Sequence, residues 1–292
     1  MRIMFRKMMT PKVESPHQYI IFIIIHCCSV NAFAQSGAAE MMAAAQKERR
    51  PAYIDIAVGL NISSFRDFAT SSLIYSGNPI YTALSHIDMD EKRESHFTLS
   101  YSFGKYQSDV NQHTSESKVN TFSLNYLELF QLRQISNSKL NVKIGGQLNA
   151  TANHRENAEL FNNSEGLDII TTLFGSAKVT LGLSRSEGKT QKRKQTLSYT
   201  MNIGVVNSSF RNGFAYTSPS APLNDDDFFR GYEWQLFKGF RLNTALDYTV
   251  FLHNKNAIQL SYIWDAYGTG GHHDNFEMAA HILKLSLLFG LK

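Results

Sequence analysis

HILKLSLLFGLK, residues 281–292, closes the chain and decides the fold class. Large apolar side chains recur in it at every second position: Leu283, Leu285, Leu287, Phe289 and Leu291. This period of two is typical of a β-strand with two different faces. Such a strand at the edge of a sheet would leave a row of backbone N–H and C=O groups unpaired, so we expect it to pair with the first strand of a closed sheet.

The same alternation recurs through the rest of the chain. It is found in residues 53–62, 96–104, 139–151, 196–205, 240–250 and 258–264. The polar faces of these segments carry mainly Asn, Ser, Thr, Gln and Gly, and most charged residues fall between the segments. A soluble sheet would present Lys and Glu to water. A small polar face suits the interior of a narrow barrel, with the apolar face toward lipid.

We predict an all-β fold, a closed antiparallel up-and-down transmembrane β-barrel of about ten strands over residues 52–292, with eight or twelve strands as alternatives. The expected strands are 52–62, 79–88, 95–106, 118–131, 139–151, 167–184, 195–206, 236–252, 257–265 and 278–291. The connections 89–94, 132–138, 185–194 and 253–256 would share one side with both chain ends. The longer ones at 63–78, 107–117, 152–166, 207–235 and 266–277 would lie on the other side. Short periplasmic turns and long external loops are typical of outer-membrane barrels.

Residues 1–34 have the organisation of a signal peptide. A basic start precedes a short apolar core at residues 19–25, and the small residues Ala32 and Ala34 predict cleavage before Gln35. The apolar core is too short to span a bilayer as a helix. Residues 35–51 then form a short N-terminal leader. Cleavage would remove Cys27 and Cys28, so the mature protein would need no disulfide.

The charge of the mature chain excludes one class of partner. The full chain has 29 basic and 25 acidic residues, and four of the basic residues and one of the acidic residues lie in the signal peptide. The remainder is nearly neutral, and nothing in it indicates nucleic acid as a partner.

The closing strand HILKLSLLFGLK, the Ala-Phe-Ala signal and the strand pattern together resemble small outer-membrane β-barrel proteins of Gram-negative bacteria. The final FGLK is most similar to that of uncharacterised barrels of the Bacteroidota. The resemblance implies an outer-membrane location with both termini periplasmic, contact with outer-membrane lipid, and insertion by the barrel assembly machinery. Lys292 departs from the aromatic residue that commonly ends such chains.

The alternation also assigns charged side chains to the lumen. Those expected to point inward are Asp55, Asp168, Asp247, Asp265, Lys143, Lys178, Arg241 and Lys284. Four acids and four bases can pair, and an unpaired charge in a narrow, filled barrel would be unfavourable. A salt-bridged plug is therefore the favoured interpretation. A polar path for small ions or solutes is the alternative.

Two acidic clusters fall in the expected external loops. They contain Asp225, Asp226 and Asp227, and His272, His273 and Asp274. Acidic residues beside a His–Asp pair have a loose similarity to the outer-membrane proteases called omptins, in which a carboxylate-held His would activate water. A divalent cation site is another interpretation. A solvated loop is the commonest outcome for such a cluster.

Lipid-directed hydrolysis needs a Ser–His pair on the lipid-facing wall. His281, His96 and Ser100 are the candidates for it, but no family motif surrounds any serine. The segment 63–79 is rich in aromatic and small residues, and we expect an ordered loop that packs on its neighbours or folds into the barrel mouth.

The expected function is that of a non-enzymatic envelope barrel, structural or a channel for small solutes. The alternatives are an outer-membrane hydrolase, protease-like or lipid-modifying, and an accessory subunit of a secretion or uptake complex with a protein partner in the outer membrane. We assign no catalytic residue, no metal and no cofactor.

Overall fold

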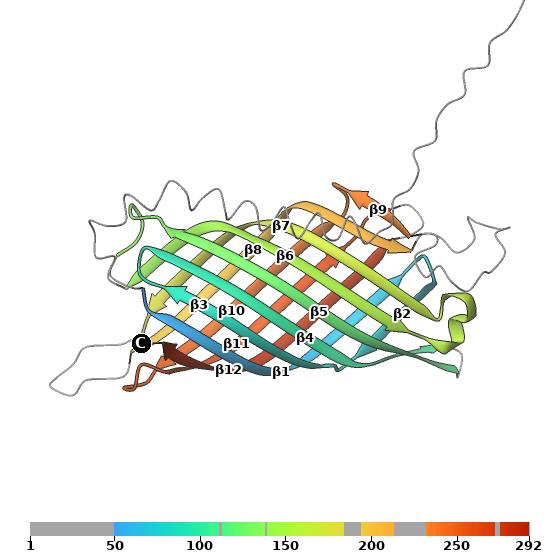
Figure 1. Ribbon diagram of the computed structural model, residues 1–292, viewed down its shortest axis with the longest axis horizontal. Helices are drawn as coiled ribbons and strands as arrows, with labels where there is room; N and C mark the ends of the chain where they lie inside the picture. Colours follow the sequence, from blue (N-terminus) through green and yellow to red (C-terminus); the bar gives the residue numbers. More distant parts are fainter. Residues whose placement is uncertain are drawn as a thin grey trace, which may run out of the picture. The chain divides into compact units, whose positions relative to one another are not determined.

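The computed structural model describes residues 50–110, 113–137, 139–183, 194–212, 232–271 and 275–291. The expected signal peptide and nearly all of the leader lie outside this part. The described chain forms a β-barrel (Figure 1). Its elements are β1 (Ala52–Asp67), β2 (Ser71–Gly77), β3 (Ile80–Met89), β4 (Arg93–Val110), β5 (His113–Gln131), β6 (Leu140–Glu156), η1 (Ala158–Asn163), β7 (Glu165–Gly182), β8 (Gln195–Asn212), β9 (Tyr232–Leu236), β10 (Phe240–Phe251), β11 (Ala257–Gly268) and β12 (Phe276–Leu291). No helix in the described part is both long and apolar enough to cross a membrane.

Ten antiparallel positions, which we call staves, close the barrel; a stave is one strand, or two strands that follow each other along the same line. Their ring order is β1, β3, β4, β5, β6, β7, β8, β10, β11 and β12, and β12 returns to β1. The short strand β2 lies between β1 and β4 and continues the stave of β3. In the same way β9 continues the stave of β10 along β8. The prediction of a closed antiparallel barrel of ten strands is confirmed.

The seam between β1 and β12 joins the two ends of the barrel sequence. It runs without interruption from the Ala52–Leu291 pair to the Asp67–Phe276 pair. We call the end of the barrel with Ala52 and Leu291 the near end, and the opposite end the far end. The alternating strand that closes the chain thus has a partner on both sides, and no edge remains there.

Several strands are longer than the sequence predicted. The segments 63–78 and 107–117, expected as loops, are largely strand: β1 continues to Asp67, β2 follows, and β4 and β5 form a long hairpin. In that hairpin both faces are polar, with Ser115 and Ser117 inside and Lys105 and Glu116 outside. Apolar alternation is therefore absent although the strands continue. The connections at 63–78 and 107–117 are therefore much shorter than predicted.

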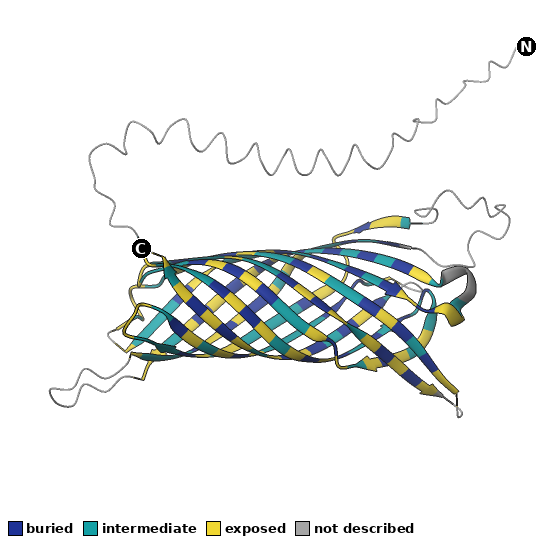
Figure 2. Ribbon diagram, turned by 60° about the horizontal axis from the view of Figure 1, so that its bottom comes forward, coloured by how far each residue is buried: buried dark blue, intermediate teal, exposed yellow. Residues whose placement is uncertain are grey.

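The outer wall is apolar toward the near end. On β1 the outward side chains from Ile54 to Ile62 are all aliphatic, and Leu60 is 70% exposed. Outward residues on other strands share this character, among them Phe97, Tyr101, Phe122, Tyr126, Ile144, Leu173, Tyr199, Ile203, Leu246, Leu260, Leu285 and Phe289. Figure 2 shows exposed and buried positions alternating along the staves. Nine residues from Ile54 to Ile62 match the length that a tilted strand needs to cross a bilayer.

On β1 and on the β4–β5 hairpin the outer wall becomes polar toward the far end. After Ile62 the outward positions of β1 are Ser64 and Arg66. On the β4–β5 hairpin the belt ends at Phe103, and Lys105 and Gln107 follow. On these strands the barrel therefore continues beyond its apolar belt. Exposed apolar side chains recur near the far end at Ile74 of β2 and Trp234 of β9.

Candidate functional site

The lumen contains three layers of polar side chains that reach across it. All three have a member on β6, which runs from the near end to the far end with Lys143 first, Asn149 and Thr151 next, and Arg155 last. We call these layers the near, middle and far clusters.

The far cluster consists of Asp67, Arg155, Asp168 and Arg211. Arg155 Nη1 lies 2.6 Å from Asp67 Oδ2 and its Nη2 lies 2.7 Å from Asp168 Oδ2. Arg211 Nη2 lies 2.6 Å from Asp67 Oδ1 and its Nε lies 3.2 Å from Asp168 Oδ1. Each arginine bridges both aspartates, and all four side chains are buried. The cluster is formally neutral, so the burial of its charges is compensated.

Aromatic side chains fill the space around the far cluster. The guanidinium of Arg155 lies 4.8 Å and that of Arg211 lies 5.5 Å from the ring centre of Phe276. Phe65 stacks on Tyr75 at 5.1 Å and meets Tyr106 edge-on at 5.3 Å. Aromatic rings and guanidinium planes pack closely and attract each other. The far half of the lumen is therefore filled with side chains.

The middle cluster adds a second layer. Arg241 of β10 pairs with Asp265 of β11 at 2.7 Å and crosses the lumen to donate to Asn149 and Thr151 of β6. The ring of Tyr267 lies 4.8 Å from the Arg241 guanidinium. Arg241 is buried, and four groups hold its side chain across the ring.

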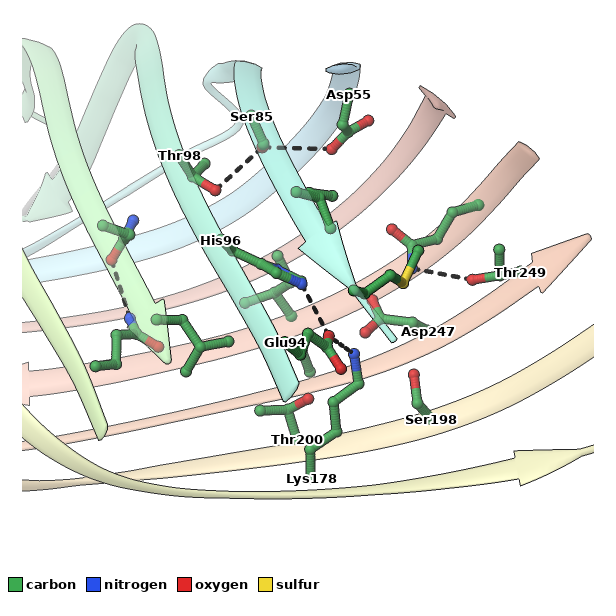
Figure 3. Close-up of a pocket in the computed structure, with 18 of the residues that line it drawn as sticks. Asp55, Ser85, Glu94, His96, Thr98, Lys178, Ser198, Thr200, Asp247 and Thr249 are labelled. Atoms are coloured by element: carbon green, nitrogen blue, oxygen red, sulfur yellow. Dashed lines mark hydrogen bonds and ion pairs between the residues drawn. The ribbon is translucent and has the colours of Figure 1, made fainter. Parts of the chain in front are cut away.

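The near cluster is built around Glu94 of β4 (Figure 3). Lys143 Nζ donates to Glu94 Oε2 at 3.0 Å, and Lys178 Nζ reaches Glu94 Oε1 from β7. His96 Nε2 lies 2.8 Å from the same Oε1. Lys143 also donates to the carbonyl oxygen of Asp90 at 2.7 Å. One carboxylate thus accepts from two ammonium groups on one side of the ring.

A cavity of about 540 Å³ occupies the near half of the lumen. Its lining starts at the near end with Pro51 and Phe251 and stops at the middle cluster with Arg241 and Asp265. No residue of the far cluster is among its lining residues. We call this cavity the cup, because it reaches the near end of the barrel and has the middle cluster as its floor.

Seven of the eight side chains that the sequence assigned to the lumen line the cup: Asp55, Asp247, Asp265, Lys143, Lys178, Arg241 and Lys284. The eighth, Asp168, is in the far cluster. Sequence reasoning missed Asp67, Glu94, Arg155 and Arg211, each of which falls in a segment that was expected to be a connection. Continued counting by twos from Asn149 through Asn153 would have assigned Arg155 to the lumen.

The external-loop candidates Asp225, Asp226, Asp227, His272, His273 and Asp274 lie outside the described residues. The two candidate histidines for lipid-directed chemistry lie within the described residues. His281 faces outward, where Tyr262 Oη lies 2.7 Å from its Nδ1, and His96 faces Glu94 in the lumen. Among the described contacts neither histidine is hydrogen-bonded to a serine, and Ser100 is buried on the lumen side.

No protein-family model matches the chain, and no curated protein matches it. Solved structures of similar architecture include the outer-membrane protease OmpT of Escherichia coli, at 8% identity and a TM-score of 0.49 over 84% of this chain and 98% of that one. Neisserial surface protein A matches at 6% identity and a TM-score of 0.36 over 82% and 97%. An outer-membrane channel from Pseudomonas putida F1 matches at 12% identity and a TM-score of 0.34, over 84% of this chain and 99% of that one. Such distant similarity extends to the barrel architecture and to no activity.

Proposed function

We propose that the protein is a non-enzymatic integral barrel of a Gram-negative outer membrane, with its near end in the periplasm and its lumen closed to through-flow. The observation that carries this proposal is the far cluster, in which Arg155 and Arg211 join Asp67 to Asp168 across the ring. The middle cluster supports it by adding a second layer across the lumen.

The distribution of side chains on the outer wall supports the membrane location. Aliphatic and aromatic side chains such as Leu60, Phe122 and Leu285 are about half exposed or more, while the lumen holds the polar groups. This reversal of the usual pattern fits a barrel whose outside meets lipid. The polar extension at the far end supports an orientation in which that end stands above the outer leaflet. Insertion by the barrel assembly machinery is part of the same proposal.

The sealed lumen distinguishes this proposal from a diffusion channel. A channel needs a continuous water-filled path, whereas the cup ends at Arg241. Opening a path would require the separation of buried ion pairs in the far and middle clusters, which would leave their charges uncompensated. Thermal motion alone would therefore open such a path rarely.

Conductance of the refolded protein in planar lipid bilayers tests the proposal. We expect no steady openings from the wild-type protein, with correct folding verified by its heat-dependent mobility in gels. A variant with Arg211→Ala and Arg241→Ala removes one crossing side chain from each cluster and should conduct. Steady wild-type openings that change in size on Asp247→Ala or Lys143→Ala would overturn the proposal in favour of a channel for small solutes.

A further inference from the structure

The charged side chains outside the lumen are divided unequally between the two ends of the barrel. Within the described residues, the near end carries seven basic and four acidic ones on its rim and outer wall, whereas the far end carries four basic and seven acidic ones. The near-end set is Arg50, Lys92, Arg93, Arg133, Lys139, Lys194 and Lys255 with Asp88, Asp90, Glu91 and Glu128. The far-end set is Arg66, Lys105, Lys118 and Lys238 with Asp109, Glu116, Glu156, Glu159, Glu165, Glu233 and Glu277. The near end therefore has a formal excess of three positive charges, and the far end has an equal excess of negative charge.

The other charges of the chain do not cancel this division. The described lumen holds six acidic and six basic side chains in its three clusters and the cup wall, so it is formally neutral. The connections outside the described part have the same signs in sequence. Residues 184–193 and 292, next to near-end strand termini, add five basic and one acidic residue, and residues 213–231 and 272–274, next to far-end strand termini, add four acidic and one basic.

The positive excess of the near end is exposed. Each of the four near-end connections contributes at least one exposed basic side chain, and we call these the basic rim: Lys92, Arg133, Lys139, Lys194 and Lys255. None of the five forms an ion pair with another described residue. Arg93, in contrast, pairs with Glu128, and the carboxylate of Asp90 accepts from the backbone N–H groups of Lys92 and Arg93. Glu91 is the one exposed acidic residue among the described residues of this end.

Exposed apolar side chains lie among the residues of the basic rim. Ile135, two residues after Arg133, is 55% exposed. Leu183 is also exposed, and its backbone N–H donates to the carbonyl oxygen of Gln195, next to Lys194. On the outer wall the apolar belt reaches the near-end termini of the strands, at Phe130 and Leu291. The headgroup layer of a bilayer is about 6 Å thick on each side, so side chains directly beyond the belt lie within it.

From these observations we infer that the basic rim docks on the phosphate headgroups of the leaflet at the near end, and that it prefers phospholipids with a net negative charge to zwitterionic ones. Phosphate oxygens accept charge-assisted hydrogen bonds from ammonium and guanidinium groups. A basic residue close to an anionic lipid surface strengthens association about fivefold. The inference rests on the proposed membrane location and adds the class of lipid that one end of the barrel selects.

A soluble anionic partner explains the observations less well. It would compensate the charge of the basic rim, but it would leave Ile135, Leu183 and Phe130 in contact with water. A lipid leaflet provides acyl chains for the apolar side chains and phosphates for the basic ones. The far end has the opposite sign and would repel anionic headgroups, so the preference should be confined to the near end.

Quenching of a fluorophore by brominated lipids tests the inference. In the mature chain, which is expected to lack cysteine, Gln134→Cys provides an exposed attachment point in the same connection as Arg133. The labelled protein is refolded into phosphatidylcholine vesicles that contain equal amounts of either dibrominated phosphatidylglycerol or dibrominated phosphatidylcholine. We expect the binding constant for the phosphatidylglycerol to be about fivefold higher, as for one basic residue at an anionic surface. The preference should disappear in about 1 M NaCl, where the screening length falls to about 3 Å.

Two triple variants of the labelled protein remove the same number of charges at opposite ends. Arg133→Gln, Lys139→Gln and Lys255→Gln together should abolish the preference, whereas Lys105→Gln, Lys118→Gln and Lys238→Gln should leave it unchanged. Equal quenching by the two lipids, a preference that persists in high salt, or equal losses in both variants would overturn the inference. Failure of the folded protein to enter vesicles at all would overturn the proposed membrane location as well, so the two failures are distinguishable.

Discussion

Asp67 and Asp168 stand on staves that face each other across the ring, β1 and β7, and the same two arginines bridge them. Each aspartate uses one oxygen for Arg155 and the other for Arg211. The four side chains thus form a ring of four ion pairs that connects opposite sides of the barrel wall. A barrel held in this way should resist flattening.

The first prediction concerns the far cluster. Arg155→Ala leaves two buried carboxylates with one arginine, so the free energy of unfolding should fall by about 3–5 kcal/mol. Urea unfolding in lipid vesicles, followed by fluorescence, measures the change. Lys105→Ala is the control: it removes the exposed Lys105–Glu116 pair and should cost no more than about 1 kcal/mol. Equal losses for the two variants would contradict the assigned role of the cluster.

The second prediction locates the membrane belt. Leu60→Arg puts a charge on the apolar outer face of β1 and should destabilise the inserted barrel by about 2–4 kcal/mol. Gln107→Arg puts the same side chain on the polar extension of β4, where it should change stability by no more than about 0.5 kcal/mol. The same unfolding measurement applies to both variants. A large loss for Gln107→Arg would mean that the belt reaches further toward the far end.

The third prediction concerns two glycines on neighbouring staves. A Cβ added to Gly145 of β6 would overlap the carbonyl oxygen of Glu128 on β5, whereas one added to Gly175 of β7 would meet only Val205 at 3.7 Å. Gly145→Ala should therefore reduce the yield of folded barrel, and Gly175→Ala should fold normally. The heat-dependent shift in gel mobility reports the folded fraction. Equal yields would show that β5 and β6 can separate locally without loss of folding.

The fourth prediction tests the seal by thiol labelling. Ser198 lines the cup, and Ser117 is buried in the far half of the barrel. In the mature chain, which is expected to lack cysteine, Ser198→Cys should react readily with a small water-soluble thiosulfonate reagent. Ser117→Cys should react much more slowly, because side chains surround it. Mass spectrometry of the labelled protein gives both rates, and comparable rates would argue against a filled far half.

The barrel could be predicted from sequence because its membrane-crossing segments alternate strongly between apolar and polar residues. The inward direction of Lys143, Arg241 and Asp247 follows from the same alternation, since their neighbours at odd spacing are apolar. The far half could not be predicted in this way. There, Ser117 inside and Lys118 outside are both polar, so the alternation contains no signal for direction.

The ion-pair partners of the charged side chains could not be predicted from the sequence either. Lys178 and Glu94 are on staves three apart, and only the curvature of the ring brings them together. Pairing across a lumen depends on how far each stave is shifted along its neighbour, and this shift is set by the whole barrel. A search restricted to adjacent strands would have paired neither residue correctly.

The seam between Ala52 and Leu291 has a consequence for the order of folding. Hairpins such as β4–β5 join residues close in sequence and can form early, but the seam needs both ends of the barrel sequence at once. Before it forms, β1 and β12 are open edges that invite pairing with other chains. The rate of assembly should therefore be limited by closure of the seam, and a chain held at that step would be the species most prone to aggregate.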